Sequence, residues 1–412
     1  MKISAINKVK VSLDFGNKIV EVGELVLQNK SIYFKYFENF LDLNLNISPY
    51  KLKLDNSIQT ADIQIFDGLF GVFDDSLPDG WGKLLVYRKL LATGINFSEI
   101  NPLLRLSIVG NNGSGALVYQ PENEDKIDYK HILSLDEIST EVNNIITDKP
   151  TNYLDEIFEL GGSSGGARPK VNLSYNESTD ELFLGNNHAN SLDNFEPWII
   201  KFPSSFDPKD IGNIEYAYYL MAKDAGIEMS NSKLFAGNRG NYYFGTKRFD
   251  RNGINRIHMH SAAGMLHDNF RLSTLDYGHL MDCAFNLEKS TLAYEKVLRL
   301  AAFNVFSNNR DDHSKNVSFL MSQEGIWKLA PAYDITFSSS SHGLHSISVA
   351  GESKNPNAEH LKKLAKTFAI KNINSIIDQV KTSVAKWNLF ADEAMVSKES
   401  RQRIGGIILS NR

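Results

Sequence analysis

The sequence predicts an α+β protein in which a small β-rich N-terminal region precedes a longer part that becomes mostly helical. Three observations support this class. The first 120 residues contain short alternating or β-branched runs separated by turns. Near residue 131 the spacing of apolar residues changes to a helical one, and beyond residue 250 helical spacing dominates. The chain is therefore expected to divide into residues 1–125, 130–250 and 251–412.

Length and composition describe an ordinary globular protein. With 412 residues, 42% hydrophobic and 23% charged, the chain can form two or three domains with sizeable cores. No run approaches the roughly 18 to 20 apolar residues of a membrane span, and the N-terminus lacks the apolar core of a signal peptide. We therefore expect a cytoplasmic protein without membrane contact. The single cysteine, Cys283, excludes an internal disulfide, and its apolar neighbours indicate a buried filler.

The charge is unevenly distributed along the chain. The net charge of −5 gives no global signature of nucleic-acid binding. Residues 351–412, however, contain eleven Lys or Arg and six Asp or Glu. Such a basic tail either faces an acidic partner or DNA, or forms a solvated helical surface.

In the N-terminal region the expected strands are residues 9–13, 21–27, 32–36 and 116–120. The segment Leu77-Pro78-Asp79-Gly80-Trp81-Gly82 precedes a helical pattern over residues 83–92. No residue of this region has an evident role in catalysis.

A glycine-rich segment follows two predicted helices, residues 133–146 and 152–160. It reads Gly161-Gly162-Ser163-Ser164-Gly165-Gly166-Ala167-Arg168-Pro169-Lys170. Its glycines let the backbone approach a ligand closely, and consecutive free N–H groups can bind phosphate oxygens. The segment matches neither G-x-G-x-x-G nor the Walker pattern, so a flexible linker is the alternative. The strand pattern over residues 171–175 favours a glycine-rich loop next to a strand.

A lysine lies inside the apolar strand pattern Pro197-Trp198-Ile199-Ile200-Lys201-Phe202-Pro203. Because a buried, unpaired ammonium is costly, Lys201 is expected to face a charged partner. Kinases place the lysine that binds the α and β phosphates in such a strand. Glu215, on an amphipathic helix fourteen residues later, is the candidate partner, and a surface glutamate is the alternative. Residues 242–250 then form a strand where a kinase hinge would contact adenine.

The segment from Asp311 to Asn316 contains two carboxylates, a histidine, a lysine and a carboxamide, and it comes directly after an apolar helical run over residues 292–306. A carboxylate followed five residues later by an asparagine is the spacing of a kinase catalytic loop, in which the Asp accepts a hydroxyl proton and the Asn binds Mg²⁺. Asp334 would be the second metal-binding residue that phosphoryl transfer requires. A polar turn between a helix and a strand is the alternative.

Two histidines, His258 and His260, stand two residues apart. They lack a third ligand at a suitable spacing, so a strand-edge or turn pair is expected rather than a metal site.

Together these segments resemble the HipA family of bacterial type II toxin serine/threonine kinases over nearly the whole chain. The segments that carry the resemblance are residues 165–170, 199–203, 248–251, 309–316 and 329–334, in matching order and spacing. The Pro-Asp-Gly-Trp-Gly segment is also similar to the N-terminal subdomain of full-length members. The chain departs from the family at Lys247, where an acidic residue is frequent, and in Ala-Arg-Pro-Lys, where other members have Ala-Gln-Glu-Lys.

The resemblance implies a small N-terminal subdomain on a two-lobed, protein-kinase-like fold, with residues 130–250 as the N-lobe and residues 251–412 as a helical C-lobe. It implies ATP and Mg²⁺ as cofactors and a protein serine or threonine as the acceptor. By position, Asp311 would be the catalytic base, and Asn316 and Asp334 the metal ligands. His313 and Lys315 would support the loop or the γ-phosphate. The implied nucleotide-binding residues are Gly165, Gly166, Ala167, Arg168, Lys170, Lys201, Glu215, Arg248 and Phe249.

The resemblance also implies regulation and partners. Autophosphorylation of the glycine-rich loop at Ser163, or at the adjacent Ser164, would switch the kinase off by ejecting the loop. The implied partners are a HipB-like helix-turn-helix antitoxin, operator DNA bound through the antitoxin complex, and a translation-related protein substrate such as an aminoacyl-tRNA synthetase. Two other classes stay open: a small-molecule phosphotransferase, and a non-catalytic co-repressor acting with an antitoxin on DNA. The intact polar set of residues favours an enzyme.

Overall fold

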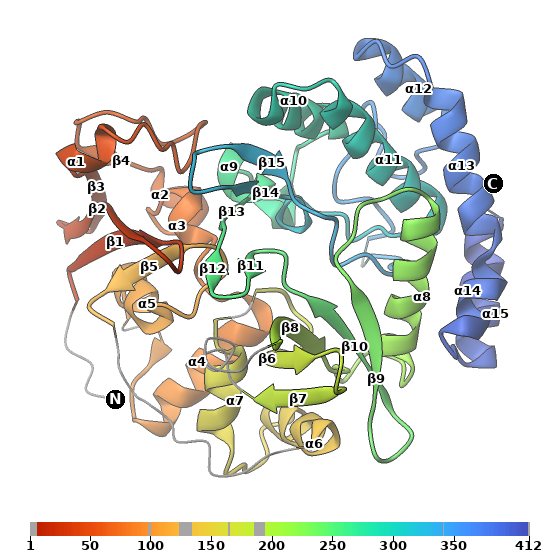
Figure 1. Ribbon diagram of the computed structural model, residues 1–412, viewed down its shortest axis with the longest axis horizontal. Helices are drawn as coiled ribbons and strands as arrows, with labels where there is room; N and C mark the ends of the chain where they lie inside the picture. Colours follow the sequence, from red (N-terminus) through yellow and green to blue (C-terminus); the bar gives the residue numbers. More distant parts are fainter. Residues whose placement is uncertain are drawn as a thin grey trace.

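The computed structural model describes residues 6–97, 100–122, 134–163, 165–184, 194–340 and 342–410. An N-terminal sheet, a second sheet in the middle of the chain and a mostly helical C-terminal part surround a common centre (Figure 1). The predicted α+β class is confirmed.

The N-terminal sheet is antiparallel and has the strand order β4-β3-β2-β1-β5. Its strands are β1 (Lys8–Asp14), β2 (Ile19–Gln28), β3 (Ser31–Tyr36), β4 (Gln59–Thr60) and β5 (Leu117–Gln120). In β1, Val9, Val11 and Leu13 are buried and Lys8 and Lys10 are more exposed, as expected of a half-buried strand, although Ser12 is buried as well. The four predicted strands of this region are confirmed.

Among the described residues, five helices accompany this sheet, and one of them, α4, packs against the middle region instead. They are α1 (Glu38–Leu41), α2 (Ile63–Phe66), α3 (Gly71–Asp74), α4 (Gly80–Ala92) and α5 (Pro102–Val109). Helix α4 packs against α7 of the middle region, where Trp81 and Leu85 join the hydrophobic core of the second sheet. The start of α4 therefore lies next to the glycine-rich segment.

The second sheet is also antiparallel, in the order β7-β6-β8-β10-β9. Its strands are β6 (Lys170–Asn176), β7 (Glu181–Leu184), β8 (Glu196–Lys201), β9 (Ser232–Ala236) and β10 (Tyr242–Lys247). The helices are α6 (Leu135–Ile146), α7 (Leu154–Gly161) and α8 (Ile211–Asp224). Lys170 pairs in register with Lys201, so the two lysines lie side by side where β6 begins and β8 ends. Helix α8 begins four residues before Glu215, so this glutamate lies within the helix rather than at its start.

The C-terminal part combines a small sheet, in the order β13-β14-β15, with long helices. The strands of the C-terminal part are β11 (Arg251–Asn252), β12 (Asn255–Arg256), β13 (His258–Ser261), β14 (Ser318–Met321) and β15 (Trp327–Leu329). The helices are α9 (Ala262–Leu266), α10 (Tyr277–Glu288), α11 (Leu292–Ser307), α12 (Ala358–Thr367), α13 (Ile373–Ala385), α14 (Trp387–Glu393) and α15 (Lys398–Ile408), with 3₁₀ turns η2 (Phe270–Leu272) and η3 (Ser314–Asn316). The predicted apolar helix over residues 292–306 is α11, which delivers the polar segment that follows it.

The N-terminal region and the C-terminal part share one continuous hydrophobic core. Helices α3 and α9 pack so closely that a Cβ at Gly71 would lie 2.2 Å from the carbonyl oxygen of Gly264. Asp75 joins the same junction, because its carboxylate accepts hydrogen bonds from the Ser261 backbone and lies 2.6 Å from His260 Nδ1. The division into residues 1–125, 130–250 and 251–412 remains a prediction.

The single cysteine and the two neighbouring histidines are buried. Cys283 is buried, and burial raises the pKa of its thiol to about 12, as expected for a filler rather than a nucleophile. His258 and His260 are buried on β13, and within the described ranges no group of three or more His, Cys, Asp or Glu side chains could hold a metal ion. None of the described helices has both the length and the apolar character that crossing a membrane would need.

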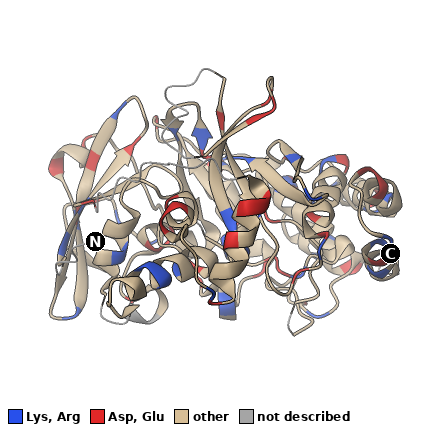
Figure 2. Cartoon of the chain, turned by 90° about the horizontal axis from the view of Figure 1, so that it is seen from below, with Lys and Arg blue, Asp and Glu red and all other residues tan. Residues whose placement is uncertain are grey.

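Charges of both signs occur on the C-terminal helices (Figure 2). Lys362 pairs with Glu359 at 3.0 Å, Lys386 with Asp224 at 2.9 Å, and Arg401 with Asp392. These pairs favour the solvated helical surface over a dedicated basic face.

Candidate active site

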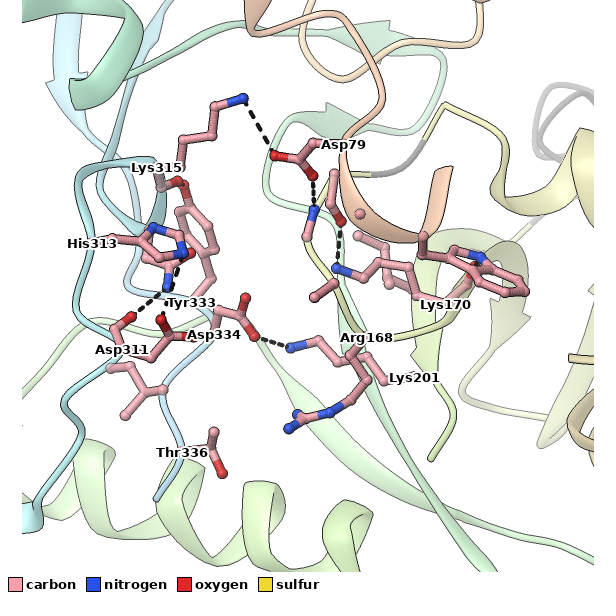
Figure 3. Close-up of a pocket in the computed structure, with 18 of the residues that line it drawn as sticks. Asp79, Arg168, Lys170, Lys201, Asp311, His313, Lys315, Tyr333, Asp334 and Thr336 are labelled. Carbon is pink, nitrogen blue, oxygen red and sulfur yellow. Dashed lines mark hydrogen bonds and ion pairs between the residues drawn. The ribbon is translucent and has the colours of Figure 1, made fainter. Parts of the chain in front are cut away.

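A cleft of about 1180 Å³ lies where the three parts of the chain meet (Figure 3). Every predicted site residue that the structure describes lines it. These residues are Ser163, Gly165, Gly166, Ala167, Arg168, Lys170, Lys201, Glu215, Arg248, Phe249, Asp311, His313, Lys315, Asn316 and Asp334. Ser164 lies outside the described residues.

Lys201, at the end of β8, binds two carboxylates inside the cleft. Its Nζ donates to Glu215 on α8 and lies 2.7 Å from Asp334 Oδ1. Glu215 is only 2% exposed, so the predicted ion pair is confirmed and the alternative of a surface glutamate is wrong. Burial alone would lower the pKa of Lys201, but the charges of Asp334 and Glu215 outweigh it and raise that pKa.

Arg168 ties the glycine-rich segment to α8. Its Nη1 donates to Glu215 Oε2 at 2.8 Å, and its Nε lies 3.3 Å from Asp207. Glu215 therefore bridges two cations, Arg168 of the glycine-rich segment and Lys201 at the end of β8. This arrangement gives a structural reason for the arginine at a position where the sequence departs from the family pattern.

Asp334 follows β15 in the left-handed backbone region, with φ +56°. Burial would raise the pKa of its carboxyl, but the positive charges of Lys201, Lys170 and Arg168 outweigh burial and hold this pKa well below the usual range. Asp334 is therefore an anion at any physiological pH.

The segment from Asp311 to Asn316 forms a loop closed by its own side chains. Asn316 Nδ2 donates to the Asp311 carbonyl at 2.9 Å. From the other side, Tyr333 Oη donates to the Lys315 carbonyl at 2.5 Å and lies 2.6 Å from Ser318 Oγ. The backbone of the loop is thus fixed at both ends.

Asp311 and its neighbour Asp312 have opposite surroundings. The Asp311 carboxylate faces the cleft, and its nearest ionisable partner is His313 Nε2 at 3.9 Å. Desolvation raises the pKa of Asp311, opposed by His313 and reinforced by Asp334. The Asp312 carboxylate is buried and binds Tyr277 Oη, the Ser346 backbone N–H and His345 Nδ1 at 2.8, 2.8 and 3.0 Å. Asp311 is available for chemistry, and Asp312 anchors the loop.

The donor set at the base of the cleft suits Mg²⁺. Mg²⁺ prefers oxygen ligands and is usually held by one or two carboxylates together with substrate phosphates. Asn316 uses its amide nitrogen for the loop, which leaves its Oδ1 available, and Asp334 supplies a carboxylate. These two residues fit a metal that is held jointly with a nucleotide.

Arg248 and Phe249, which were predicted to contact the nucleotide, contact other side chains of the chain. The Arg248 guanidinium donates to both carboxylate oxygens of Asp250, at 2.9 and 2.8 Å, and to Asn172 Oδ1 at 3.2 Å. The Phe249 ring packs against Tyr333, with centroids 5.4 Å apart. Their roles as nucleotide contacts remain predictions.

Ser163, at the entry to the glycine-rich segment, is held by the N-terminal region. Its Oγ donates to the Asn112 carbonyl at 2.7 Å. The hydroxyl is thus part of a contact between two regions of the chain.

No site residue was predicted in the N-terminal region, but the structure places Asp79 in the cleft. One oxygen of Asp79 accepts a hydrogen bond from the Gly166 backbone N–H, and the other lies 3.3 Å from Lys315 Nζ. Trp81 adds backbone and indole hydrogen bonds to the glycine-rich segment, both 3.0 Å long. The Pro-Asp-Gly-Trp-Gly segment was the available signal, although nothing in its spacing connects it to a loop more than eighty residues away.

Comparisons with known proteins cover most of the chain. The model of the HipA-like C-terminal domain matches residues 162–387, and the model of the HipA N-terminal domain matches residues 17–120. The fold is similar to the complex of HipA, HipB and operator DNA from the Shewanella oneidensis MR-1 toxin–antitoxin system, with a TM-score of 0.68, 18% identity, and coverage of 97% of this chain and 95% of that chain. The Helicobacter pylori proinflammatory kinase CtkA matches 53% of this chain and 90% of its own, with 12% identity and a TM-score of 0.34. No curated protein sequence matches the chain.

Proposed function

The chain belongs to the HipA family, and from this premise we propose that it is a toxin kinase that transfers the γ-phosphoryl group of ATP to a serine or threonine of another protein. The observation that carries the proposal is the convergence of Lys201, Asp311, Asn316 and Asp334 in one cleft, although they are spread over more than 130 positions. Phosphoryl transfer needs this combination: a cation for the phosphates, oxygen ligands for a metal and a base for the acceptor hydroxyl.

In this mechanism each residue has a defined task. Lys201, oriented by Glu215, would bind the α and β phosphates. Asn316 and Asp334 would hold Mg²⁺, whose charge offsets the charge that develops on the transferring group. Asp311 would accept the proton of the acceptor hydroxyl while the new O–P bond forms and the bond between the γ-phosphorus and its bridging oxygen breaks. The raised pKa of Asp311 suits this task, because a base works best when its pKa approaches the working pH.

The proposed partners follow from the family and from the fold relative. That relative was solved as a complex of HipA, HipB and operator DNA. We propose that this chain likewise binds a HipB-like helix-turn-helix antitoxin and reaches operator DNA through it. Its proposed acceptor is a translation-related protein such as an aminoacyl-tRNA synthetase.

Incubation with radiolabelled ATP and Mg²⁺ tests the proposed activity. The purified chain should transfer label from the γ position to serine or threonine of a protein, assayed first on a panel of purified aminoacyl-tRNA synthetases and then on a cell extract. Because the metal is held jointly with the nucleotide, chelation with EDTA should abolish transfer, and added Mg²⁺ should restore it. Label that enters only small molecules would favour a small-molecule phosphotransferase. DNA-dependent association with an antitoxin, without any ATP turnover, would favour a non-catalytic co-repressor.

Autophosphorylation is proposed at Ser163, whose hydroxyl lies in the cleft. A phosphate there would replace the hydroxyl donor by anionic acceptors facing the Asn112 carbonyl, so the contact would be lost and the segment released. Mass spectrometry after incubation with ATP should find phosphate at Ser163, and the Ser163→Ala variant should keep transferring phosphate for longer than the wild type. Phosphate on Ser164 alone, with Ser163→Ala inactivated as fast as the wild type, would move the assignment to Ser164.

A further inference from the structure

Asp79 stands at the start of α4, but its side chain does not cap that helix. An aspartate at this position usually accepts a hydrogen bond from one of the first backbone N–H groups of its own helix. Here no such bond is present. The carboxylate points into the cleft instead, where it binds the Gly166 N–H and Lys315 (Figure 3).

The backbone around Asp79 is fitted closely to the glycine-rich segment. Gly80 has φ +44°, and a Cβ there would lie 2.3 Å from the Gly166 carbonyl oxygen. That same carbonyl accepts a hydrogen bond from the Trp81 N–H at 3.0 Å. Both backbone groups of Gly166 are therefore bound by residues 79–81, and the approach is possible only because position 80 has no side chain.

The two donors that hold the Asp79 carboxylate are donors that a nucleotide would use. Backbone N–H groups of a glycine-rich segment bind phosphate oxygens, and Lys315 is predicted to support either the loop or the γ-phosphate. Asp74 lies 3.6 Å from the same lysine, so Lys315 is already neutralised by two carboxylates. A phosphate oxygen and the Asp79 carboxylate carry the same charge and cannot share these donors without strong repulsion.

The glycine-rich segment also lies close to the site of the proposed metal. A Cβ at Gly166 would be 4.0 Å from Asp334 Oδ2, and Lys170 Nζ donates to the Gly165 carbonyl at 2.6 Å. With the Gly166 N–H and Lys170 satisfied within the protein, the segment occupies space beside Lys201 and Asp334. A triphosphate that binds beside these residues through the Gly166 N–H has to displace the Asp79 carboxylate from that donor.

We propose that Asp79 competes with the phosphates of ATP for the Gly166 N–H and Lys315, so that the N-terminal region determines the nucleotide affinity of the kinase site. This inference rests on the proposed function. In the nucleotide-free state Asp79 occupies the donors, and in the bound state it leaves them. The displaced carboxylate has a nearby destination, because a rotation of its side chain would let it cap α4 in the usual way.

The Asp79→Asn variant tests the competition with little change in shape. Asparagine keeps an oxygen that can accept the Gly166 N–H but removes the negative charge that repels phosphate. We expect its dissociation constant for AMP-PNP with Mg²⁺, measured by isothermal titration calorimetry, to be about tenfold lower than that of the wild type. Asp79→Ser, which retains a good N-cap residue without the charge, should change the affinity in the same direction. A kinetic assay should show the gain as a lower KM for ATP.

A matched control is Asp67→Asn, which removes another N-terminal carboxylate. Asp67 is paired with Arg105 at 2.7 Å on the surface and does not line the cleft. Its loss should leave nucleotide binding unchanged.

The outcomes separate this inference from the proposed function. A wild type that binds AMP-PNP, together with Asp79 variants of equal or weaker affinity, would overturn the competition and leave the kinase proposal standing. If the variants bind AMP-PNP more weakly than the wild type, the role of Asp79 would be to support the loop rather than to compete with phosphate. Binding by the variants but not by the wild type would support the competition strongly. Absence of binding in all of these folded proteins, checked by circular dichroism, would overturn both proposals.

Discussion

Replacement of Asp311 by alanine is expected to lower kcat of phosphoryl transfer by about 10³-fold, the middle of the range for loss of a general base. The fold should be retained, because the Asp311 carboxylate faces the cleft and, among the residues that the structure describes, has no partner closer than His313 at 3.9 Å. The binding of AMP-PNP should change little, since the phosphates are assigned to other residues. The variant should therefore bind nucleotide, melt near the wild-type temperature and fail to transfer label from ATP.

The adjacent aspartate provides a matched control with the opposite expectation. Asp312→Ala would leave the Tyr277 hydroxyl and the Ser346 N–H without their buried acceptor. Each unsatisfied buried group costs about 1–3 kcal/mol, so the free energy of unfolding should fall by several kcal/mol. Chemical denaturation of the two variants measures the difference. Wild-type transfer by Asp311→Ala, or a stable but inactive Asp312→Ala, would show that the base has been assigned to the wrong residue.

The sequence predicted those parts of the site in which a charged or polar side chain would be energetically costly without a partner. A lysine in an apolar strand needs a counter-charge, and the only good candidate on the following helix was Glu215. The structure contains that pair. The spacing from Asp311 to Asn316 likewise fixes a loop, because the asparagine side chain reaches back to the carbonyl of the aspartate. Such short-range relations can be found from the sequence because few residues separate the partners.

The parts that the sequence did not predict depend on contacts between distant segments. Gly166 and Asp79 are 87 positions apart, and no local pattern indicates that an N-cap aspartate will turn away from its own helix. Arg248 was assigned to the nucleotide because it lies in a family motif. Its partner Asp250 is only two residues away. Their bidentate pairing depends on the burial of both side chains, however, and the sequence does not show that burial. Nor could the sequence indicate that the N-terminal sheet shares its core with the C-terminal helices.

The glycine-rich segment shows how these two kinds of information combine. Its glycines indicated close approach to a ligand, and in this structure one close approach is to the protein itself. Residues 79–81 bind both backbone groups of Gly166, and one of them, the N–H, belongs to the glycine-rich backbone that was predicted to bind phosphate. A loop built to accept an anion can be satisfied by a carboxylate of its own chain.

The second large effect is expected at Asp334, where Asp334→Asn removes a proposed metal ligand while preserving the side-chain shape. Loss of the charge should lower kcat by about 10²–10³-fold, because metal-assisted charge stabilisation is a large contribution to phosphoryl transfer. Increasing the Mg²⁺ concentration should restore only part of the activity, since the variant binds the metal more weakly.

The binding of AMP-PNP with and without metal separates a ligand role from a structural one. In EDTA the variant should bind the nucleotide at least as tightly as the wild type, because an anion beside the phosphates is gone and Lys201 loses a competing partner. Addition of Mg²⁺ should tighten binding to the wild type and have little effect on the variant. A variant that gains as much affinity from Mg²⁺ as the wild type would show that the metal is held elsewhere. Asp334 would then serve mainly to orient Lys201, and the proposed division of tasks within the cleft would have to change.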